Sequence, residues 1–414
     1  MRYSSSFPKT TRSAPAGTEL PGQAFLFRSG YIDQLMAGVF TLLPLGWRTA
    51  EKIKQIIREE MNSVGGQELA MPVLQPKELW QETGRWESLK GAMYQLKDKS
   101  EKDLGIAFTH EETALDLIRK HAHSYKDFPI SIYHFATKLR DEPRARGGII
   151  RVREFVMKDL YSAHTTKEDM DRYYEEVAAA YQKAFKRMGL EVKRVKASGG
   201  VFTKELSDEF QVLADFGEDT IYYCQKCDFA QNKEVAEVAE GDKCPECKGL
   251  IAVSRGVEVG NIFRFGTHYS EKMNVKFTGE DGKESFVYLA SYGIGVGRAL
   301  GTLSELYHDD KGLTWPAQVA PFTVHLVGLQ MDNMKVRETA EKLEKDLEEK
   351  KIEVLYDDRD ESPGVKLADA DMIGLPWRVI VSPKSLAAGG VEVKKRDSDR
   401  SEVISPAQFL KKFS

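Results

Sequence analysis

Apolar residues recur at helical spacing in the first quarter of the chain. Between residues 45 and 64 they stand three or four positions apart, at Ala50, Ile53, Ile57, Met61 and Val64, and this spacing predicts an amphipathic helix. A proline precedes the segment and two glycines follow it, which are residues typical of a helix start and a helix end. Residues 67–72 then predict a short strand that ends at Pro72, and residues 167–188 predict a second long helix.

Two alternating segments near the middle of the chain predict an antiparallel hairpin. They cover residues 130–135 and 149–161, and the charged, glycine-bearing stretch 140–148 separates them. Further along, residues 286–292 predict a buried strand. The strand turns at the glycine-rich stretch 293–297 into a helix that begins at Arg298.

The pattern changes after Trp315-Pro316 and Ala320-Pro321. Beyond these prolines the chain predicts strands over 322–329, 352–356 and 378–382 and helices over 335–349 and 364–373. Strands that alternate with helices form layered α/β domains. We therefore expect an α/β (α+β) protein, with a mainly antiparallel sheet flanked by helices followed by a smaller three-layer α/β domain.

Composition narrows the class of protein. At 414 residues the chain exceeds what one compact core usually serves, so two or three domains are expected. The hydrophobic content of 41% and the charged content of 30% are those of a globular protein, and apolar runs of membrane-spanning length are absent from the sequence. A net charge of −4 gives no overall signature of nucleic-acid binding, so any RNA contact must come from local patches.

The four cysteines form two pairs within 24 residues. They are Cys224 with Cys227 and Cys244 with Cys247, and sixteen residues separate the pairs. This spacing is typical of a tetrahedral zinc ribbon, here residues 222–250, although four ordinary buried thiols remain the alternative. Without a secretory signal the pattern also predicts a reducing, cytoplasmic location.

The hairpin carries side chains that suit a nucleotide. Arg140 and Arg151 could grip phosphate through paired hydrogen bonds, Glu142 could accept from an exocyclic amine, and Phe155 could cover a purine ring. These residues describe an ATP site without a phosphate loop of the Walker type. A charged hairpin by itself, however, is usually a solvated surface.

The glycine-rich turn supplies a second arginine. Gly293, Gly295 and Gly297 let the backbone approach a ligand, and Arg298 adds its charge at a helix start. A dinucleotide-binding fingerprint would need glycine at position 298, so that alternative fails. A zinc protease motif at His110 fails as well, because Ala114 stands where it needs histidine.

Three segments in this order resemble the signature motifs of class II aminoacyl-tRNA synthetases: residues 44–72, 133–164 and 286–306. Within that class the chain is similar to the bacterial-type prolyl-tRNA synthetases. The phrases that carry the resemblance are residues 78–86, 153–159, 255–260 and 357–359. The resemblance covers almost the whole chain and implies a catalytic domain over 1–318 and an anticodon-binding domain over 321–414.

The resemblance also implies roles for individual residues. The implied ATP-binding residues are Arg140, Glu142, Arg151, Phe155, Thr267 and Arg298, of which Arg140 and Arg298 would be catalytic. The implied proline-binding residues are Thr109, Glu111, Arg140, His164 and Gly266. The family usually has proline where Phe108 stands and histidine where Asn261 stands, so the pocket wall differs here.

The implied ligands and partners are ATP, Mg²⁺, proline, tRNA(Pro) and a second copy of the chain, with a structural Zn²⁺ in the ribbon. Arg144 and Arg146 at the hairpin tip would touch the acceptor stem. From Pro321 onward 16 basic residues stand against 18 acidic ones, so only the family likeness assigns RNA binding to that domain.

One part of the family pattern is missing. Bacterial-type prolyl enzymes commonly carry an inserted editing domain, whereas this chain runs from residues 216–219 almost directly into the cysteine ribbon. We expect no editing site in this chain, so that alanine is mischarged and a separate trans-editing protein has to clear it.

Three other interpretations stay open at this point. A synthetase for another amino acid should differ around Thr109 and Glu111. A relative without enzymatic activity should lack Arg140 and Arg298, which are both present. A nucleic-acid-binding zinc ribbon would account for the cysteines and leave most of the chain unexplained.

Overall fold

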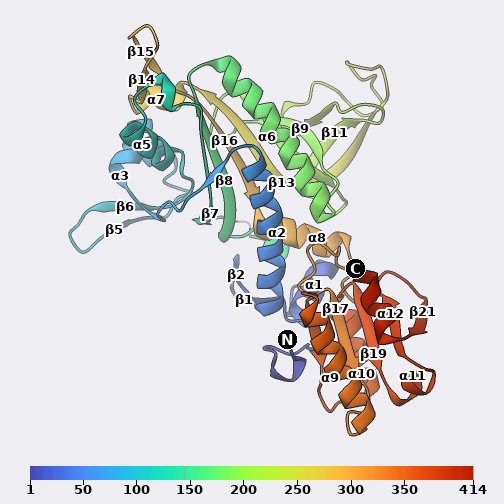
Figure 1. The fold of residues 1–414 in the computed structure, drawn as a ribbon. Helices are drawn as coiled ribbons and strands as arrows, with labels where there is room; N and C mark the ends of the chain where they lie inside the picture. The colour runs from blue at the N-terminus through green and yellow to red at the C-terminus, as the bar shows by residue number, and fades with distance from the viewer. Residues whose placement is uncertain (144, 414) are drawn as a thin grey trace. The chain divides into compact units, whose positions relative to one another are not determined.

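The computed structural model describes residues 1–143 and 145–413 and divides into two compact units (Figure 1). One unit comprises residues 37–39 and 53–302, and the other comprises residues 1–36, 40–52 and 303–414. The N-terminal residues 1–36, which the sequence assigned to the catalytic domain, therefore group with the C-terminal sheet. The reason is local pairing: the Met1 amino group donates to the Val354 carbonyl at 2.9 Å, and Arg2 forms a bridge with Tyr356.

A nine-stranded sheet forms the centre of the larger unit. Its order is β10-β9-β12-β11-β13-β16-β8-β7-β3, with β10 also paired to β13, and most neighbours are antiparallel as expected. The strands are β3 (Gln67–Glu68), β7 (Ile130–Leu139), β8 (Glu154–His164), β9 (Lys193–Ser198), β10 (Leu206–Leu213), β11 (Asp219–Cys224), β12 (Ala230–Asn232), β13 (Ile251–Gly266) and β16 (Tyr288–Gly295).

The hairpin β7–β8 differs from its prediction at the tip. Register runs from Ile130 opposite Ala163 to Leu139 opposite Glu154, so the second strand begins at Glu154 and not at residue 149. Gly147 and Gly148 have φ of 62° and 61° and lead into a 3₁₀ turn over Gly148–Ile150. Left-handed glycines of this kind close a turn, which is why residues 149–150 are not strand.

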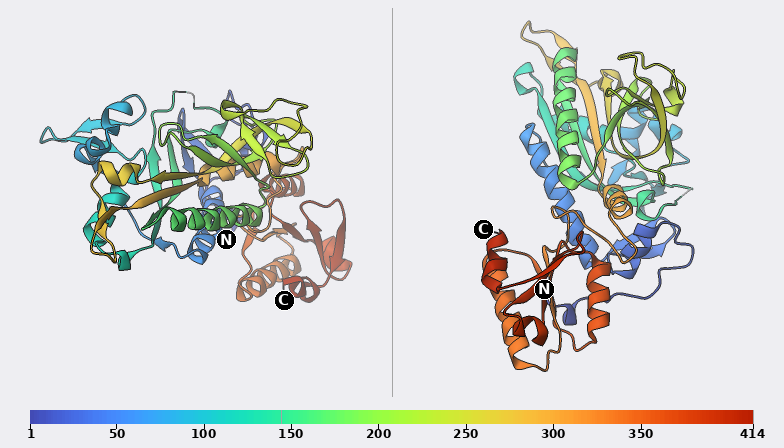
Figure 2. Two further views of the ribbon diagram at one scale, coloured as in Figure 1. Left: turned by 90° about the horizontal axis from the view of Figure 1, so that it is seen from above. Right: turned by 90° about the vertical axis from the view of Figure 1, so that its right-hand side faces the viewer.

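Helix α6 (Lys167–Met188) packs on one face of this sheet, against β8, β13 and β16 (Figure 2). The Thr166 side chain caps its start by accepting from the Asp169 amide, and Gly189, with φ of 93°, ends it. Along β8 the side chains alternate: Lys158 donates to the Tyr181 hydroxyl of α6, whereas Met157 and Asp159 line a cavity. The cavity therefore lies on the face opposite α6.

Shorter elements complete the larger unit. Helices α3 (Lys77–Thr83), α4 (Arg85–Ser88), α5 (Glu111–His121) and α7 (His268–Lys272) pack near the small sheet of β4 (Leu74–Pro76), β6 (Asp103–Ile106) and β5 (Gln95–Lys97). A hairpin of β14 (Lys276–Thr278) and β15 (Glu284–Phe286) follows. Helices α2 (Pro44–Ser63) and α8 (Val296–Leu306) match the two predicted helices of motifs one and three closely.

The second unit contains a five-stranded sheet in the order β18-β17-β19-β20-β21. Its strands are β17 (Val324–Gly328), β18 (Val354–Asp357), β19 (Trp377–Val381), β20 (Val391–Lys395) and β21 (Ser401–Ile404). Helix α9 (Met334–Glu349) buries Val336, Ala340, Leu343 and Leu347 on one face, as predicted, and α10 (Pro363–Ile373) packs on the other through Ala370. The expected three layers are confirmed.

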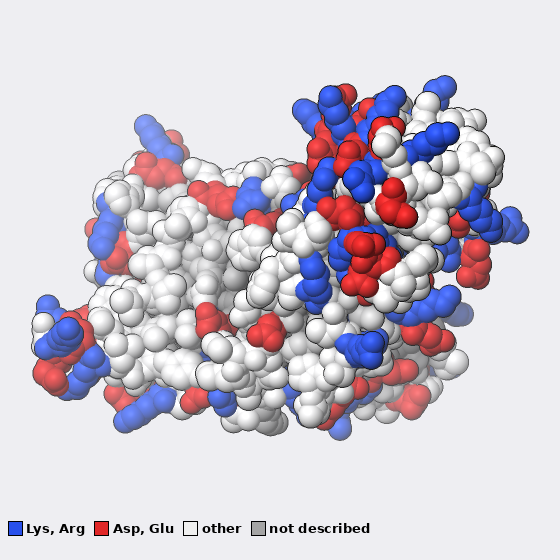
Figure 3. All heavy atoms as spheres, turned by 90° about the horizontal axis from the view of Figure 1, so that it is seen from below, with Lys and Arg blue, Asp and Glu red and all other residues white. Residues whose placement is uncertain are grey.

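Several helices and strands here were not predicted from the sequence. They are β20, β21, α1 (Pro21–Arg28), β1 (Ile32–Met36), β2 (Val39–Leu42), α11 (Pro383–Ala387) and α12 (Pro406–Leu410). Within the described ranges, 1–143 and 145–413, no helix combines the length and the apolar character needed to cross a membrane. On the face drawn in Figure 3, basic and acidic side chains are interspersed, in keeping with the small net charge.

Candidate active site

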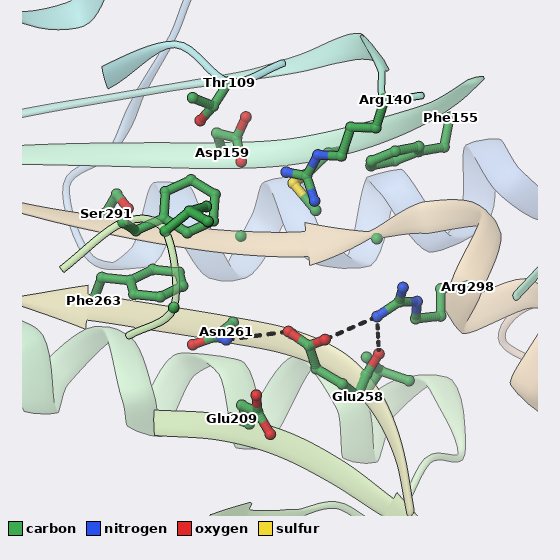
Figure 4. A pocket seen from close by; sticks show the side chains of 18 of the residues that line it. Thr109, Arg140, Phe155, Asp159, Glu209, Glu258, Asn261, Phe263, Ser291 and Arg298 are labelled. Carbon is green, nitrogen blue, oxygen red and sulfur yellow. Dashed lines mark hydrogen bonds and ion pairs between the residues drawn. The ribbon is translucent and has the colours of Figure 1, made fainter. Parts of the chain in front are cut away.

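A cavity of about 350 Å³ lies on the open face of the nine-stranded sheet, a size that suits a small-molecule ligand. The hairpin β7–β8 forms one wall, strands β13 and β16 form the floor, and the loops before β10 and α5 close the ends. Figure 4 shows how the side chains enter it from these separate elements. Its polar lining residues include Thr109, Glu111, Arg140, Asp159, Glu209, Glu258, Asn261, Ser291 and Arg298.

Arg140 enters the cavity from the end of β7. Its Nε donates to the Phe108 carbonyl at 3.4 Å, and its guanidinium carbon lies 4.6 Å from the Phe108 ring and 5.3 Å from the Phe155 ring. Burial lowers the pKa of the Arg140 guanidinium, and the positive charge of Arg298 acts in the same direction. Two like charges that face one cavity favour an anion between them.

Arg298 enters from the first turn of α8. Its Nε donates to the Ile150 carbonyl at 2.9 Å, and its Nη1 donates to the carbonyl and to the carboxylate of Glu258, at 2.9 and 3.0 Å. Figure 4 shows Arg298 and Arg140 on different elements of the same cavity. The fold thus brings together two arginines that are far apart in the sequence, as the interpretation of the hairpin and the glycine-rich turn required.

Thr109 and Glu111 form the other end of the cavity. Both are buried, with 4% and 3% of their surface exposed, and the Thr109 hydroxyl donates to Glu111 Oε1 at 2.9 Å. The His110 amide between them donates to the Tyr161 hydroxyl at 3.1 Å, which fixes the turn at the start of α5. A buried carboxylate held in this way suits a positively charged amine.

Two acidic residues of the cavity floor were missed by the sequence analysis. Glu209 of β10 and Glu258 of β13 both line the cavity, and burial, with the charge of Glu258 as the second cause, raises the pKa of Glu209 to about 8. The Gln211 and Asn232 amides donate to Glu209 at 2.8 and 3.2 Å. Neighbouring carboxylates of this kind are ligands that a hard divalent cation such as Mg²⁺ prefers.

The hairpin tip carries a network of ion pairs outside the cavity. Arg151 contacts Glu142 and Glu218, both at 2.8 Å, and Arg146 contacts Glu218 at 2.6 Å. Glu142, Arg146 and Arg151 are therefore close to one another, but they are not among the residues that line the cavity. Arg144, the other predicted contact for the acceptor stem, lies outside the described residues.

Three further predicted residues also lie away from the cavity lining. His164 is fully buried beside α6, where its Nδ1 donates to Asp169 at 2.6 Å, and burial lowers the pKa of its imidazole. Gly266 has φ of 56° at the end of β13, and Thr267 precedes α7, where its hydroxyl donates to Glu271 at 2.5 Å. None of the three lines the cavity among the described residues.

The two positions that depart from the family pattern have defined neighbours. Phe108 stacks on Phe202 with ring centroids 6.2 Å apart, and Phe202 lies 5.0 Å from Phe263, so aromatic rings wall the amino-acid end. The Asn261 amide donates to Glu258 Oε1 at 3.1 Å. Asn261 therefore orients a carboxylate of the cavity floor.

A cluster of His110, His134 and Asp159 has the residue types of a metal site, and Asp159 also lines the cavity. Lys138 occupies its centre: its Nζ contacts His110 Nδ1 and Asp159 and lies 3.4 Å from His134 Nε2. Burial lowers the pKa of His110 to about 2. The ammonium already supplies the positive charge that a metal would, so this cluster is a buried ion-pair network.

The four cysteines converge as their spacing predicted. All four Sγ atoms lie within 4.8 Å of one another, with Cys224 and Cys247 3.4 Å apart and Cys227 and Cys244 3.6 Å apart. These separations are too long for disulfides and close to the roughly 3.8 Å edge of a tetrahedron with metal–sulfur bonds of about 2.3 Å. The Lys226 and Gly249 amides donate to Cys224 and Cys247, at 3.3 and 3.4 Å, which suits thiolates.

Comparison with known proteins agrees with this geometry. Residues 94–307 match the family described as the tRNA synthetase class II core domain (G, H, P, S and T), and residues 321–414 match the anticodon binding domain. The Cryptosporidium parvum prolyl-tRNA synthetase, solved with halofuginone and AMPPNP, superposes with a TM-score of 0.77 at 18% identity. The match covers 95% of this chain and 77% of that one, and it shows the shared fold.

Curated relatives align over nearly their whole length. A proline–tRNA ligase of Wolbachia from Brugia malayi is 41% identical over 425 residues, with full coverage of both chains, and that of Agrobacterium fabrum is 39% identical with 98% of each covered. A Dehalococcoides mccartyi ligase is 35% identical, with 98% of this chain and 97% of that protein covered, but its alignment spans 550 positions, so a long stretch of it has no counterpart here. The chain belongs to the proline–tRNA ligases, a family of class II aminoacyl-tRNA synthetases.

Proposed function

We propose that this protein activates proline with ATP and transfers it to the 3′ end of tRNA(Pro), and that it has no editing site of its own. The observation that carries the proposal is the convergence of Arg140, Arg298 and Glu111 on one cavity. Two guanidinium groups can bind a triphosphate, and a buried carboxylate beside them can bind an amino group.

The amino-acid end of the cavity suits proline. The secondary ammonium would lie against Thr109 and Glu111, which are already hydrogen-bonded to each other, and the carboxylate would face Arg140. The Phe202 and Phe263 rings offer the apolar surface that a pyrrolidine ring needs. The assignments of His164 and Gly266 to proline stay predictions, since neither lines the cavity.

The other end suits a nucleotide. Phe155 would cover the adenine and Arg298 would hold the γ-phosphate of a bent ATP, while Glu142 and Arg151 would approach the base from the hairpin, after their mutual ion pair opens. Glu209 and Glu258 would hold Mg²⁺, which when bound neutralises phosphate charge. Thr267 stays a prediction for ATP, because it lies directly before α7 and does not line the cavity.

The reaction has two steps. The proline carboxylate attacks the α-phosphorus in line, which forms prolyl-adenylate and releases pyrophosphate, and Arg140 stabilises the charge that grows on the phosphate oxygens. The terminal ribose hydroxyl of tRNA then attacks the activated carbonyl, and AMP leaves. Neither step uses a protein nucleophile, so the residues act by binding and orientation.

The cysteine ribbon fits a structural Zn²⁺. Four thiolates would complete its coordination and leave no position for a substrate, as is typical of a structural zinc. The segment has few apolar residues of its own: Cys224, Cys244 and Ile251 are its buried core. A metal would stabilise a loop of this kind by holding its two turns together.

The proposal includes three macromolecular partners. Arg144 and Arg146 would contact the tRNA acceptor stem and residues 321–414 the anticodon, in line with the family match of that segment. A homodimer would form through residues 44–72, beyond which the apolar side chain of Leu74 is 56% exposed. A separate trans-editing protein would clear mischarged alanine in the cytoplasm.

ATP–pyrophosphate exchange with each of the twenty amino acids tests the proposal. We expect exchange that depends on proline, with weaker exchange on alanine. Exchange that depends on another amino acid, or none with any of the twenty, would contradict it. The mass of the purified protein in solution, measured by light scattering, tests the dimer separately.

A further inference from the structure

Arg85 is a buried cation next to the amino-acid end of the cavity. It begins α4 directly after Gly84, whose φ is 78°, and only 6% of its surface is exposed. Its guanidinium carbon lies 5.3 Å from the Trp80 and Phe202 rings and 5.5 Å from the Tyr269 ring. Rings on three sides replace most of the water that a guanidinium normally binds, so its charge must be balanced by protein carboxylates.

Two adjacent carboxylates provide that balance. Arg85 Nη1 donates to Glu111 Oε2 at 3.1 Å and to Glu112 Oε1 at 3.1 Å. The second oxygen of Glu111 accepts from Thr109, and Glu112 accepts from the Thr83 hydroxyl at 2.8 Å. Of the two carboxylates, Glu111 lines the cavity and Glu112 lies behind it, completely buried.

The charges of this group do not cancel. One guanidinium stands against two carboxylates, which leaves one net negative charge at the end of the cavity. Burial raises the pKa of Glu112, Arg85 opposes that rise, and the charge of Glu111 adds to it. Without the guanidinium, the two adjacent carboxylates would repel each other, and no cation would hold Glu111 in its place.

We propose that Arg85 is a positioning residue for substrate recognition: it fixes the Glu111 carboxylate toward the cavity and balances Glu112, so that the ammonium of the amino acid meets one net negative charge. The inference rests on the proposed function, because it takes the amino group of proline to be the ligand of Glu111. It adds Arg85 and Glu112, neither of which lines the cavity, to the residues that decide amino-acid affinity.

Other ionisable groups around the pair stay constant in the experiment. They are Tyr269 on α7, Lys138 on β7, Arg140 directly after β7, and Asp159 and Tyr161 on β8. Burial raises the pKa of Tyr161 and of Tyr269, so both stay neutral in the assay range, and Lys138 is paired with Asp159. Differences among variants of Arg85 and Glu112 therefore report on the contacts that position Glu111.

The test measures KM for proline and KM for ATP by pyrophosphate exchange at neutral pH, in four variants of the full chain. Arg85→Gln should raise KM for proline by about tenfold or more at neutral pH, as expected for a lost charged contact. The cause is the loss of the contact that positions Glu111, together with repulsion between the two carboxylates. Arg85→Lys, which retains the charge, should raise KM for proline much less than Arg85→Gln.

Glu112→Gln provides a test without any change to the arginine. It leaves Arg85 and Glu111 as a neutral pair, so KM for proline should rise although Glu112 does not line the cavity. The double variant Arg85→Gln/Glu112→Gln has one net negative charge again, so its KM should be closer to that of the wild type than the KM of Arg85→Gln. KM for ATP should stay within about twofold of the wild-type value in all four variants, because substitutions far from a site usually leave it unaffected.

Three results would overturn the inference: a double variant that binds proline more weakly than Arg85→Gln, a Glu112→Gln variant with unchanged KM for proline, or parallel increases in both KM values. The last result would indicate a merely structural role for Arg85. Failure of the proposed function itself would be seen separately, as a wild-type protein without proline-dependent exchange.

Discussion

Arg298 donates from a single nitrogen, Nη1, to both the backbone carbonyl and the carboxylate of Glu258, at 2.9 and 3.0 Å. The first turn of α8 is thereby tied to the middle of β13 before any nucleotide binds. The contact keeps the guanidinium inside the cavity, where its charge is partly neutralised. Binding of a triphosphate would release the carboxylate for a cation, so the two groups can change partners without leaving the site.

Arg298→Ala should lose most of the activity in the first reaction step, the formation of prolyl-adenylate. We expect kcat/KM for ATP in pyrophosphate exchange to fall by about 10²–10³-fold, the usual effect of removing a group that stabilises developing charge. Arg337→Ala is the matched control, because Arg337 is an exposed arginine of α9 in the other unit. Equal activities of the two variants would remove Arg298 from the proposed mechanism.

Glu209→Gln should change how stability depends on pH. Folding raises the pKa of Glu209 from its ordinary value of 4.5 to about 8, so the folded chain binds this proton more tightly than the unfolded chain does. The resulting stabilisation is complete below about pH 4.5 and is lost as pH rises through about 8. The Glu209→Gln variant lacks a titrating carboxyl group at this position, so it lacks this pH-dependent stabilisation.

The midpoint temperature of Glu209→Gln relative to the wild type should therefore increase between pH 5.5 and pH 8.5. Thermal unfolding in buffer with a chelator of divalent cations measures it. A constant difference across this range would show that Glu209 does not titrate there.

Removal of the ribbon metal should destabilise the protein. Cys247→Ser should lose zinc, measured by elemental analysis. Its melting temperature should fall by about 5 °C or more, since each kcal/mol lost shifts the midpoint by roughly 2–4 °C in a domain of this size. Glu246→Gln, a substitution in the same turn, should retain the bound zinc and the melting temperature of the wild type. A wild-type protein purified without bound metal, with the same melting temperature as Cys247→Ser, would exclude a structural zinc.

Alanine should be attached to tRNA(Pro) by the purified enzyme. A pocket built for proline cannot strongly reject a smaller side chain, since each missing methylene costs only about 1–3 kcal/mol of discrimination. Labelled alanine should therefore accumulate on the tRNA, at a rate well below that of proline. Rapid loss of preformed alanyl-tRNA on addition of the enzyme alone would reveal an editing site in this chain.

The sequence was most informative where local signals act. Helix α6 lies at its predicted bounds, 167–188, because Thr166 caps one end and Gly189 ends the other. The stripe of α9 was also correct, since helical spacing alone determines which residues share a face. The start of β8 was misplaced because two left-handed glycines build a turn from residues that otherwise look like strand.

The candidate site was only partly predictable, for reasons of topology. The chemistry of the hairpin and the glycine-rich turn indicated Arg140, Phe155 and Arg298, the family resemblance added Thr109 and Glu111, and all five line the cavity. Glu209 was not predicted because strand pairing determines its neighbours. The pairing of β10 with β13 places it opposite Asn261, a residue more than fifty positions away. No local pattern in the sequence reports such a pairing.

Strand β13 connects the cysteine ribbon with the cavity. Its first residue, Ile251, pairs with Cys224 at the cysteine ribbon, and the same continuous strand carries Glu258, Asn261 and Phe263 past the cavity. Side chains alternate along a strand, and Asn261 and Phe263 stand two positions apart, so a slip of one residue would turn both away from the substrates together. The register of β13 along the cavity therefore depends on how firmly the cysteine cluster holds the first residue of the strand.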